Sequence, residues 1–331
     1  MFIKLKGKDL MIAQVYVDDI VFGSTAESLK NEFIKFMEVE FVMSMISQLN
    51  NYFLGLQDKQ LADSFFLSQT KYAQNMVEKF GLRDSKGVRT PLGQQDKLSK
   101  DDDGKTVDQK LYKSIIGSLL YLTVSRPDIS FSVGVCARFQ STPKESHLKA
   151  AKRILKYVKG IEELGLWYSN RSDLDLIGFT DSDWAGCYDD RKSTTIGCFY
   201  IGDNIVSWSS KKQNSIALST AEAEYIAAGS CCAQLLWIRQ MLHDYGIGHD
   251  SFTLFCDNTS AINISKNPVQ HGRTKHIDIR YHFIRDLVEN EVCDLKHIGT
   301  NDQKADILTK ALHADRFEKL QRDLGICSRS P

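Results

Sequence analysis

The sequence lacks the features that mark strongly charged, secreted or membrane-spanning proteins. Its 331 residues include 42 Lys plus Arg and 42 Asp plus Glu, so the formal net charge is zero. Net charge therefore does not favour adhesion to nucleic acid, and such contacts would depend on local basic patches or metal ions. No apolar leader follows Met1, and apolar runs such as residues 119–122 are far shorter than a membrane span. We expect no membrane segment and a cytoplasmic or nuclear location.

Metal-binding cysteine motifs are also missing. The eight cysteines include no Cys-x-x-Cys pair, and no His-x-x-x-His set accompanies them, so a zinc site is not indicated. Reduced, buried cysteines are typical of such a chain. With 42% apolar and 25% charged residues, the composition is that of an ordinary globular protein, and the length predicts two or three domains.

The first third of the chain predicts a hairpin followed by helices. Two β-rich runs within residues 10–23 flank Asp18 and Asp19, which we expect at the hairpin tip. A divalent cation would relieve the repulsion between these carboxylates, although a plain solvated turn is the alternative for any Asp-Asp pair. The next helix should begin at Ser24 or Thr25 as N-cap, and its apolar positions are expected to be core: Leu29, Phe33, Phe36, Met37 and Phe41.

The middle of the chain changes character twice. After a strand at 65–68 and a helix at 71–80, residues 84–108 are polar and aperiodic, which predicts a linker. Three helices are then predicted within residues 109–160. The last carries five basic residues that either face a phosphate backbone or simply solubilise the helix: Lys149, Lys152, Arg153, Lys156 and Lys159.

From about residue 172 the pattern predicts an antiparallel meander and then alternating helices and strands. This order indicates an α/β (α+β) fold with a mixed sheet covered by helices. A long helix is expected at 220–243, with Ser219 as a possible N-cap. The other expected elements are strands at 175–181, 195–202, 205–210, 252–256 and 293–298, a short segment at 260–264, and helices at 275–289 and 303–312.

Four acids occupy strand ends and helix starts in this region. Asp181 and Asp257 each end a strand, whereas Glu224 and Asp306 lie in the first turns of helices. Acids at such positions can converge and hold two Mg²⁺ ions, or Mn²⁺, through their oxygens. Two such ions suit in-line attack of water on a phosphodiester. Each acid alone has a structural explanation, such as a helix-start charge, so the prediction depends on their joint occurrence.

Several sequence strings together resemble the C-terminal part of the Pol polyprotein of copia-type LTR retrotransposons of plants. They include Tyr16-Val17-Asp18-Asp19, Arg126-Pro127-Asp128, Asp183-Trp184-Ala185-Gly186, Ser219-Thr220-Ala221-Glu222-Ala223-Glu224-Tyr225 and Ala305-Asp306-Ile307-Leu308-Thr309-Lys310. The resemblance implies a partial reverse transcriptase palm and thumb, a connection region and a ribonuclease H-like domain. The implied divisions are 1–83 for the palm and thumb, 84–108 for the linker, 109–171 for the helical connection, 172–312 for the ribonuclease H-like domain and 313–331 for a tail helix.

The resemblance also implies an activity, namely Mg²⁺-dependent endonucleolytic hydrolysis of the RNA strand of RNA–DNA hybrids. The catalytic and metal-binding acids would be Asp181, Glu224, Asp257 and Asp306, with Glu222 as the competitor of Glu224. Asp183 is expected to be structural. Asp18 and Asp19 would be a metal-binding pair of a polymerase palm.

Nucleic-acid contacts are expected from local basic residues and from groups that recognise the 2′-hydroxyl across the minor groove. For the lysines a purely solvated role is an equal alternative. His276, His282 and His297 could shuttle protons or steer product release, with a structural role as the alternative. The candidates for contact are Arg191, Lys192, Ser193, Lys211, Lys212 and His276.

A polymerase needs a further metal-binding aspartate and fingers upstream of Asp18, and the sequence begins shortly before it. We therefore expect no independent polymerase activity. The alternatives are a catalytically silent nucleic-acid-binding remnant, or RNA-directed DNA polymerase activity when upstream fingers and palm are supplied. The expected partners are RNA–DNA hybrids and, if the reading frame continues upstream, other Pol regions such as integrase.

Overall fold

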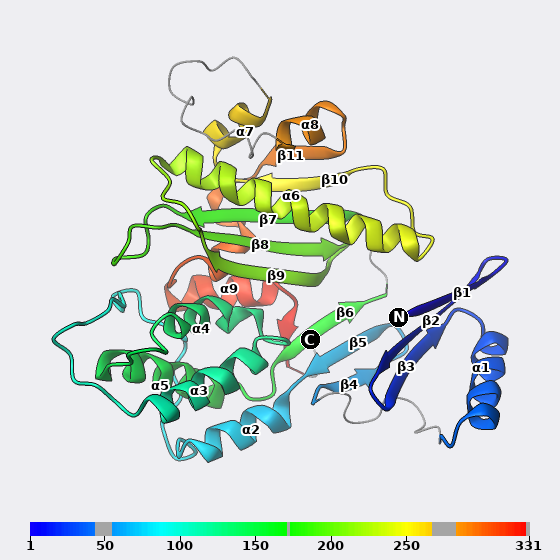
Figure 1. Cartoon of the computed structure of the whole chain (residues 1–331), viewed down its shortest axis with the longest axis horizontal. Coiled ribbons are helices and arrows are strands. Elements are labelled where there is room, and N and C mark those ends of the chain that lie inside the picture. The colour runs from blue at the N-terminus through cyan, green and yellow to red at the C-terminus, as the bar shows by residue number, and fades with distance from the viewer. Residues whose placement is uncertain (44–54, 171–172, 267–282, 329–331) are drawn as a thin grey trace.

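The computed structural model describes residues 1–43, 55–170, 173–266 and 283–328. Within these residues the strands form three sheets of three, four and five strands (Figure 1). In Figure 1 the small three-stranded sheet and its helix lie at the lower right, and the five-stranded sheet lies at the top. No helix in the described part of the chain combines the length and apolar character needed to cross a membrane.

The three-stranded sheet contains the predicted hairpin. Strands β1 (Phe2–Lys6), β2 (Asp9–Tyr16) and β3 (Asp19–Ser24) are antiparallel, and Tyr16 pairs opposite Asp19. Asp18 therefore lies in the tip, as predicted, next to Val17 in the left-handed region with φ 51°.

Helix α1 (Glu27–Glu40) corrects two predictions. Its N-cap is Ala26, because the hydroxyl of Thr25 is occupied by the backbone N–H of Leu10 at 2.8 Å. Only part of the predicted apolar stripe is core. Leu29 is buried, but Phe36 and Phe41 are 58% and 55% exposed. Within the described residues, α1 packs on β2 and β3 with one face, and Phe36 and Phe41 lie outside that contact.

The four-stranded sheet joins distant parts of the chain. Strands β4 (Gln57–Gln60), β5 (Ser64–Ser68), β6 (Gly165–Ser169) and β12 (Ile326–Cys327) are antiparallel in the order β12-β6-β5-β4. The helices near this sheet are α2 (Thr70–Lys79), α3 (Gln109–Leu122), α4 (Ser130–Ala137), α5 (Glu145–Gly160) and α9 (Ala314–Asp323). Residues 84–108 contain no helix or strand, as predicted, although Leu92 is buried and Asp108 caps α3.

A buried ion pair in the turn between α3 and α4 contacts two of these helices, α5 and α9. Arg126 donates to both carboxylate oxygens of Asp128 at 2.9 and 2.7 Å, and the two side chains are almost fully buried. Tyr157 of α5 and Gln321 of α9 also donate to Asp128, at 2.5 and 2.9 Å. Burial alone would raise the pKa of Asp128, but Arg126 and the two hydrogen bonds hold it below its ordinary value. The string Arg126-Pro127-Asp128 is therefore explained by packing.

The five-stranded sheet is mixed, as predicted. Strands β7 (Leu176–Asp183), β8 (Thr194–Ile201) and β9 (Asn204–Lys212) form an antiparallel meander. Strands β10 (Phe252–Cys256) and β11 (Cys293–His297) continue it in parallel, giving the order β11-β10-β7-β8-β9. Helix α6 (Thr220–Asp244), capped by Ser219, crosses one face (Figure 1).

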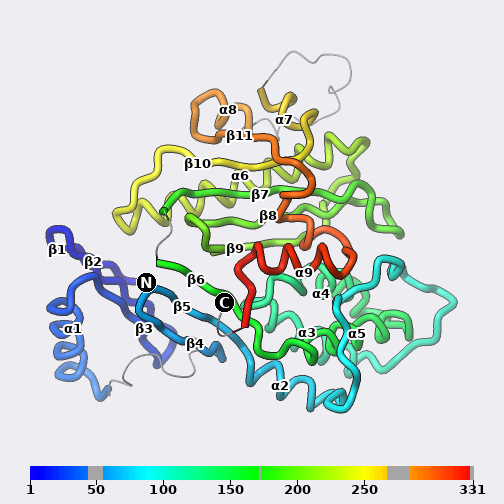
Figure 2. Tube along the Cα trace, turned by 180° about the vertical axis from the view of Figure 1, so that it is seen from behind, coloured from blue at the N-terminus to red at the C-terminus, as the bar shows by residue number. Residues whose placement is uncertain are grey.

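Two apolar clusters cover the two faces of this sheet. One contains Phe199 and Leu254 of the sheet with Leu235 of α6. The other joins Phe179 and Ile196 to the helices that precede the sheet and to α9. In both views α9 lies beside β9, the last strand in the sheet order (Figure 2). A single core thus extends across position 171, and the domain division given above stays a prediction.

The last elements of the chain differ in part from the predicted ones. The helix predicted at 303–312 is a short 3-10 helix, Lys304–Leu308, and the predicted tail helix is α9, which ends before β12. The segment at 260–264 lies within α7 (Thr259–Lys266). Only α8 (Phe283–Glu289) is described from the helix predicted at 275–289.

Candidate metal centre

The ends of β7 and β10 place two of the four acids side by side. The strands are parallel, with Thr180 paired to Cys256, so the following residues lie at the same end of the sheet. Asp257 follows the end of β10, whereas Asp181 lies within β7, which runs on to Asp183 and is thus longer than predicted. Asp181 is 4% exposed, and its carboxylate accepts the backbone N–H of Ser182 at 2.9 Å. Asp257 is half-buried and accepts the hydroxyl of Thr300 at 3.3 Å.

Helix α6 directs Glu224 towards the same point. Glu224 accepts the N–H of Ser182 at 3.0 Å, so this one donor serves both Asp181 and Glu224. The candidate ligand atoms of Glu224, Cys256 and Asp257 lie within 4.8 Å of one another. Glu222 instead accepts the backbone N–H of Leu218 at 2.7 Å and stabilises the start of the helix. Of the two candidates, Glu224 is the one that faces Asp181.

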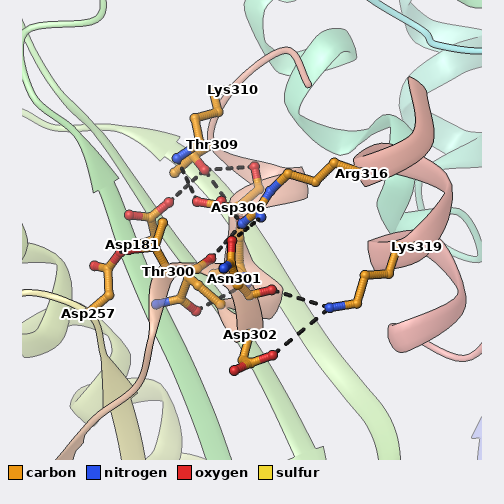
Figure 3. Close-up of polar contacts among 12 residues, drawn as sticks. Asp181, Asp257, Thr300, Asn301, Asp302, Asp306, Thr309, Lys310, Arg316 and Lys319 are labelled. Carbon is orange, nitrogen blue, oxygen red and sulfur yellow. Dashed lines mark hydrogen bonds and ion pairs between the residues drawn. The ribbon is translucent and has the colours of Figure 1, made fainter. Parts of the chain in front are cut away.

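The fourth acid, Asp306, comes from the 3-10 helix and is 1% exposed. Lys310 and Arg316 lie 2.7 and 2.5 Å from its two carboxylate oxygens. Thr309 links it to the other acids, because the Thr309 hydroxyl donates to Asp181 at 2.7 Å (Figure 3). The structure therefore brings all four predicted acids together from four different elements.

Burial dominates the electrostatics of Asp181 and Glu224. Burial raises the pKa of Asp181 to about 6, against the opposing charge of Lys310 and with a further contribution from Asp306. Burial, Asp181 and Asp257 raise the pKa of Glu224 to about 10. Buried carboxylates that share a single N–H donor fit a hard divalent cation such as Mg²⁺, which prefers oxygen ligands. The thiol of Cys256 is a soft ligand that Mg²⁺ does not prefer.

Asp183 continues β7 beyond Asp181 but has a partner of its own. Its carboxylate accepts the backbone N–H of Thr194 on β8, and burial raises its pKa to about 6. The next residue, Trp184, donates its indole N–H to the carbonyl of Ala217 at 3.1 Å. These contacts fix the loop that leaves the site.

The hairpin acids are in a different environment. Asp18 and Asp19 are both exposed at the tip between β2 and β3. Among the described residues, the acids and thiols close enough to hold one ion are Glu224, Cys256 and Asp257, and the hairpin acids are not part of such a group. A metal-binding role for Asp18 and Asp19 stays a prediction.

The residues predicted to contact nucleic acid lie in different environments. Lys211 and Lys212 pair with Thr195 and Thr194, so they lie on the same end of the sheet as the acids. Lys211 and Arg191 are exposed, whereas Lys212 is paired with Asp190 at 2.7 Å.

Ser193 corrects the prediction of a surface contact. It is fully buried and accepts the N–H of Ala185 at 3.1 Å, so its side chain has no surface for a phosphate. Lys192, its neighbour, is half-buried. His276 and His282 lie outside the described residues, and His297 is exposed at the end of β11.

Sequence reasoning missed several residues of the site. Thr309 and Lys310 were inside a quoted string, and Cys256 directly precedes Asp257, so each carried a signal. Arg316 and Thr300 carried none, because their proximity to the acids depends on how α9 and the loop before the 3-10 helix pack.

Comparison with known proteins gives both family and fold. Residues 1–94 match the family described as "Reverse transcriptase (RNA-dependent DNA polymerase)". The Pol polyprotein from transposon RE1 of Arabidopsis thaliana is 36% identical over 100% of this chain and 23% of that protein. The one from transposon TNT 1-94 of Nicotiana tabacum is 37% identical over 99% of this chain and 25% of that protein. The chain thus spans about a quarter of the length of these curated relatives.

One solved structure has a similar fold over most of the chain. It is the foamy viral protease-reverse transcriptase in complex with RNA/DNA hybrid, with a TM-score of 0.50. The match covers 87% of this chain and 36% of that chain at 15% identity. At this identity the likeness concerns the fold alone.

Proposed function

The chain belongs to the Pol polyprotein family of copia-type LTR retrotransposons, and from this premise we propose that residues 172–312 hydrolyse the RNA strand of RNA–DNA hybrids. The observation that carries the proposal is the convergence of four acids, three of them buried, at one end of the central strands of the mixed sheet. The sheet order β9-β8-β7-β10-β11, with acids on β7, after β10 and on α6, supports a ribonuclease H-like arrangement.

Asp181, Glu224, Asp257 and Asp306 would hold Mg²⁺, which supplies activation of a water molecule and neutralisation of the phosphodiester oxygens. The protein's own groups orient these acids. The N–H of Ser182 holds Asp181 and Glu224 on a common donor, and Thr309 fixes the second oxygen of Asp181. Such preorganisation lowers the cost of assembling the charged site.

The hybrid would be bound beside the acids by exposed basic residues at the same end of the sheet. Lys211 and Arg191 are the exposed candidates for phosphate contacts. The foamy viral protein was solved with an RNA/DNA hybrid, which supports the choice of this substrate class. Recognition would depend on helix shape and the 2′-hydroxyl, with little sequence preference.

The direct test is cleavage of a labelled RNA strand in a hybrid by the purified chain with Mg²⁺. We expect cleavage that stops with a chelator. Glu224→Gln should remove it, and Glu222→Gln is a matched control because both side chains are buried on α6. An intact hybrid, or equal cleavage by the two variants, would refute the proposal. Salt-sensitive binding without cleavage would identify a silent nucleic-acid-binding remnant.

A second candidate is RNA-directed DNA polymerase activity when fingers and the rest of the palm are supplied. The match of residues 1–94 to the reverse transcriptase family, with Asp18 and Asp19 at an exposed hairpin tip, favours it. Primer extension in the presence of an added upstream fragment, lost in Asp18→Asn, would support this activity. Extension that survives Asp18→Asn and Asp19→Asn together would rule out the hairpin pair as its metal site.

A further inference from the structure

The two halves of the acid site differ in charge. On the Asp306 side, Lys310 and Arg316 each lie within ion-pair distance of one carboxylate oxygen, at 2.7 and 2.5 Å (Figure 3). On the other side, Glu224 and Asp257 lie with Cys256 within 4.8 Å. Among the described residues, no Lys, Arg or His forms an ion pair with Glu224 or Asp257. One half is therefore neutralised by the protein itself, and the other is not.

The two cations on Asp306 are held differently. Arg316 is 28% exposed and also donates to the carbonyl of Thr300 at 2.5 Å and to Asn301 at 3.4 Å, so its guanidinium is fixed at three points. The side chain of Lys310 is 49% exposed, and Asp306 is its ion-pair partner within the described residues. A lysine ammonium on a flexible stem can leave such a contact at lower cost than a guanidinium bound at several points.

Lys310 is also close to where a metal ion would have to go. Thr309, its neighbour, donates to Asp181 at 2.7 Å, so adjacent residues contact the two acids of this half. A divalent cation shared by Asp181 and Asp306 would meet the positive charge of Lys310. Two like charges at a few ångström repel strongly in a partly buried site. The ammonium and the ion therefore compete for Asp306.

We propose that the Lys310 ammonium holds the place of a divalent cation at Asp306, so that metal binding between Asp181 and Asp306 requires Lys310 to move away. The inference rests on the proposed function for the identity of the metal site. Lys310 is thus a positioning residue for this half of the site, because its ammonium holds Asp306 until an ion takes its place.

The test measures Mn²⁺ binding to the full chain by titration calorimetry, without nucleic acid. In Lys310→Met we expect the weaker of the two sites to tighten about fivefold or more. Lys296→Met is a matched control, because Lys296 pairs with Asp294 at 2.7 Å and is 52% exposed. Its Mn²⁺ affinity should equal that of the wild type.

Further variants separate charge from structure. Lys310→Arg should keep the weak site weak, since the charge remains. Adding Asp306→Asn to Lys310→Met should remove the gain. If Lys310→Met loses its cooperative thermal transition, Lys310→Gln is measured instead, with the same expectation.

Unchanged Mn²⁺ affinity in a folded Lys310→Met or Lys310→Gln protein overturns the inference, even if the hybrid is cleaved. If Lys310→Met binds Mn²⁺ more tightly but the wild-type chain leaves hybrids intact, the proposed function is overturned and the competition between Lys310 and the ion at Asp306 is still supported. The two failures are thus distinguishable, because the readout is metal binding and not turnover.

Discussion

The hairpin tip and one end of the central strands of the five-stranded sheet both present neighbouring acids, but they place them in opposite environments. Asp18 and Asp19 are adjacent in the sequence and exposed to water. Asp181 and Glu224 are distant in the sequence, but both are buried and both accept the same backbone N–H, that of Ser182. Convergence of separate elements, and not sequence adjacency, is therefore what concentrates carboxylates in a buried place.

Physical chemistry explains why the second arrangement points to function. A solvated carboxylate pair is screened by water and costs little. Buried carboxylates without counter-ions are costly, and this cost raises the pKa of Glu224 to about 10. Strongly perturbed acids in one place are typical of functional sites.

The largest expected effect contrasts one acid from each region. Asp181→Asn should lower the rate of hybrid cleavage about 100-fold or more, because a ligand of the proposed metal centre is lost. Asp18→Asn combined with Asp19→Asn should leave the rate within about twofold of wild type. Single-turnover cleavage of a short hybrid measures both. A comparable loss in the hairpin variant would show that the two regions act together.

Asp128 separates burial from function, because it is a buried acid with a full set of partners. Asp128→Asn should destabilise the fold by about 3 kcal/mol, since it leaves Arg126 buried without its counter-charge. The pKa of Asp128 is lowered in the fold, so its contribution is present above the unfolded pKa and is lost as pH falls through the folded value. Urea unfolding of wild type and variant should therefore converge at low pH. A constant difference down to pH 3 would contradict this assignment.

Glu224 should have the opposite pH dependence when metal is absent. Its pKa is raised to about 10 in the fold, so the protonated form is favoured and stability is lost as pH rises above the unfolded value. With a chelator, Glu224→Gln should be more stable than wild type by about 1–2 kcal/mol at pH 8, and the gain should vanish near pH 4. Thermal unfolding across this range measures it. Excess Mg²⁺ should cancel the gain, and a gain independent of pH would rule out the titration of this acid.

Much of the fold and most of the acid site could be predicted because the signals were local. Strand 252–256 and the Ser219 cap were confirmed, since alternation and capping chemistry depend on a few neighbouring residues. The exposure of Phe36 and the 3-10 helix at Asp306 could not be predicted, because each depends on how much surface a distant element offers.

The cations of the site show the same limit. Lys310 was within a quoted string, but its ion pair with Asp306 required the turn geometry of the 3-10 helix. Arg316 reaches Asp306 from α9, and this contact depends on how α9 packs against the sheet. Ser193 lay among basic residues in the sequence, yet the loop turns its side chain inward.

The smallest expected effect tests whether nucleic acid is bound beside the acids or on the three-stranded sheet. Lys211 is exposed on β9, at the sheet end where Asp181 lies, and Lys8 is exposed in the turn between β1 and β2. Lys211→Met should weaken hybrid binding about two- to fivefold and reduce the dependence of log K on log salt by about one, because one phosphate contact is lost. Lys8→Met removes the same charge and should leave affinity and salt slope unchanged. Fluorescence anisotropy with a short hybrid at several salt concentrations measures both. Equal losses in the two variants would mean that the hybrid extends across both regions, and a loss only in Lys8→Met would place it on the three-stranded sheet.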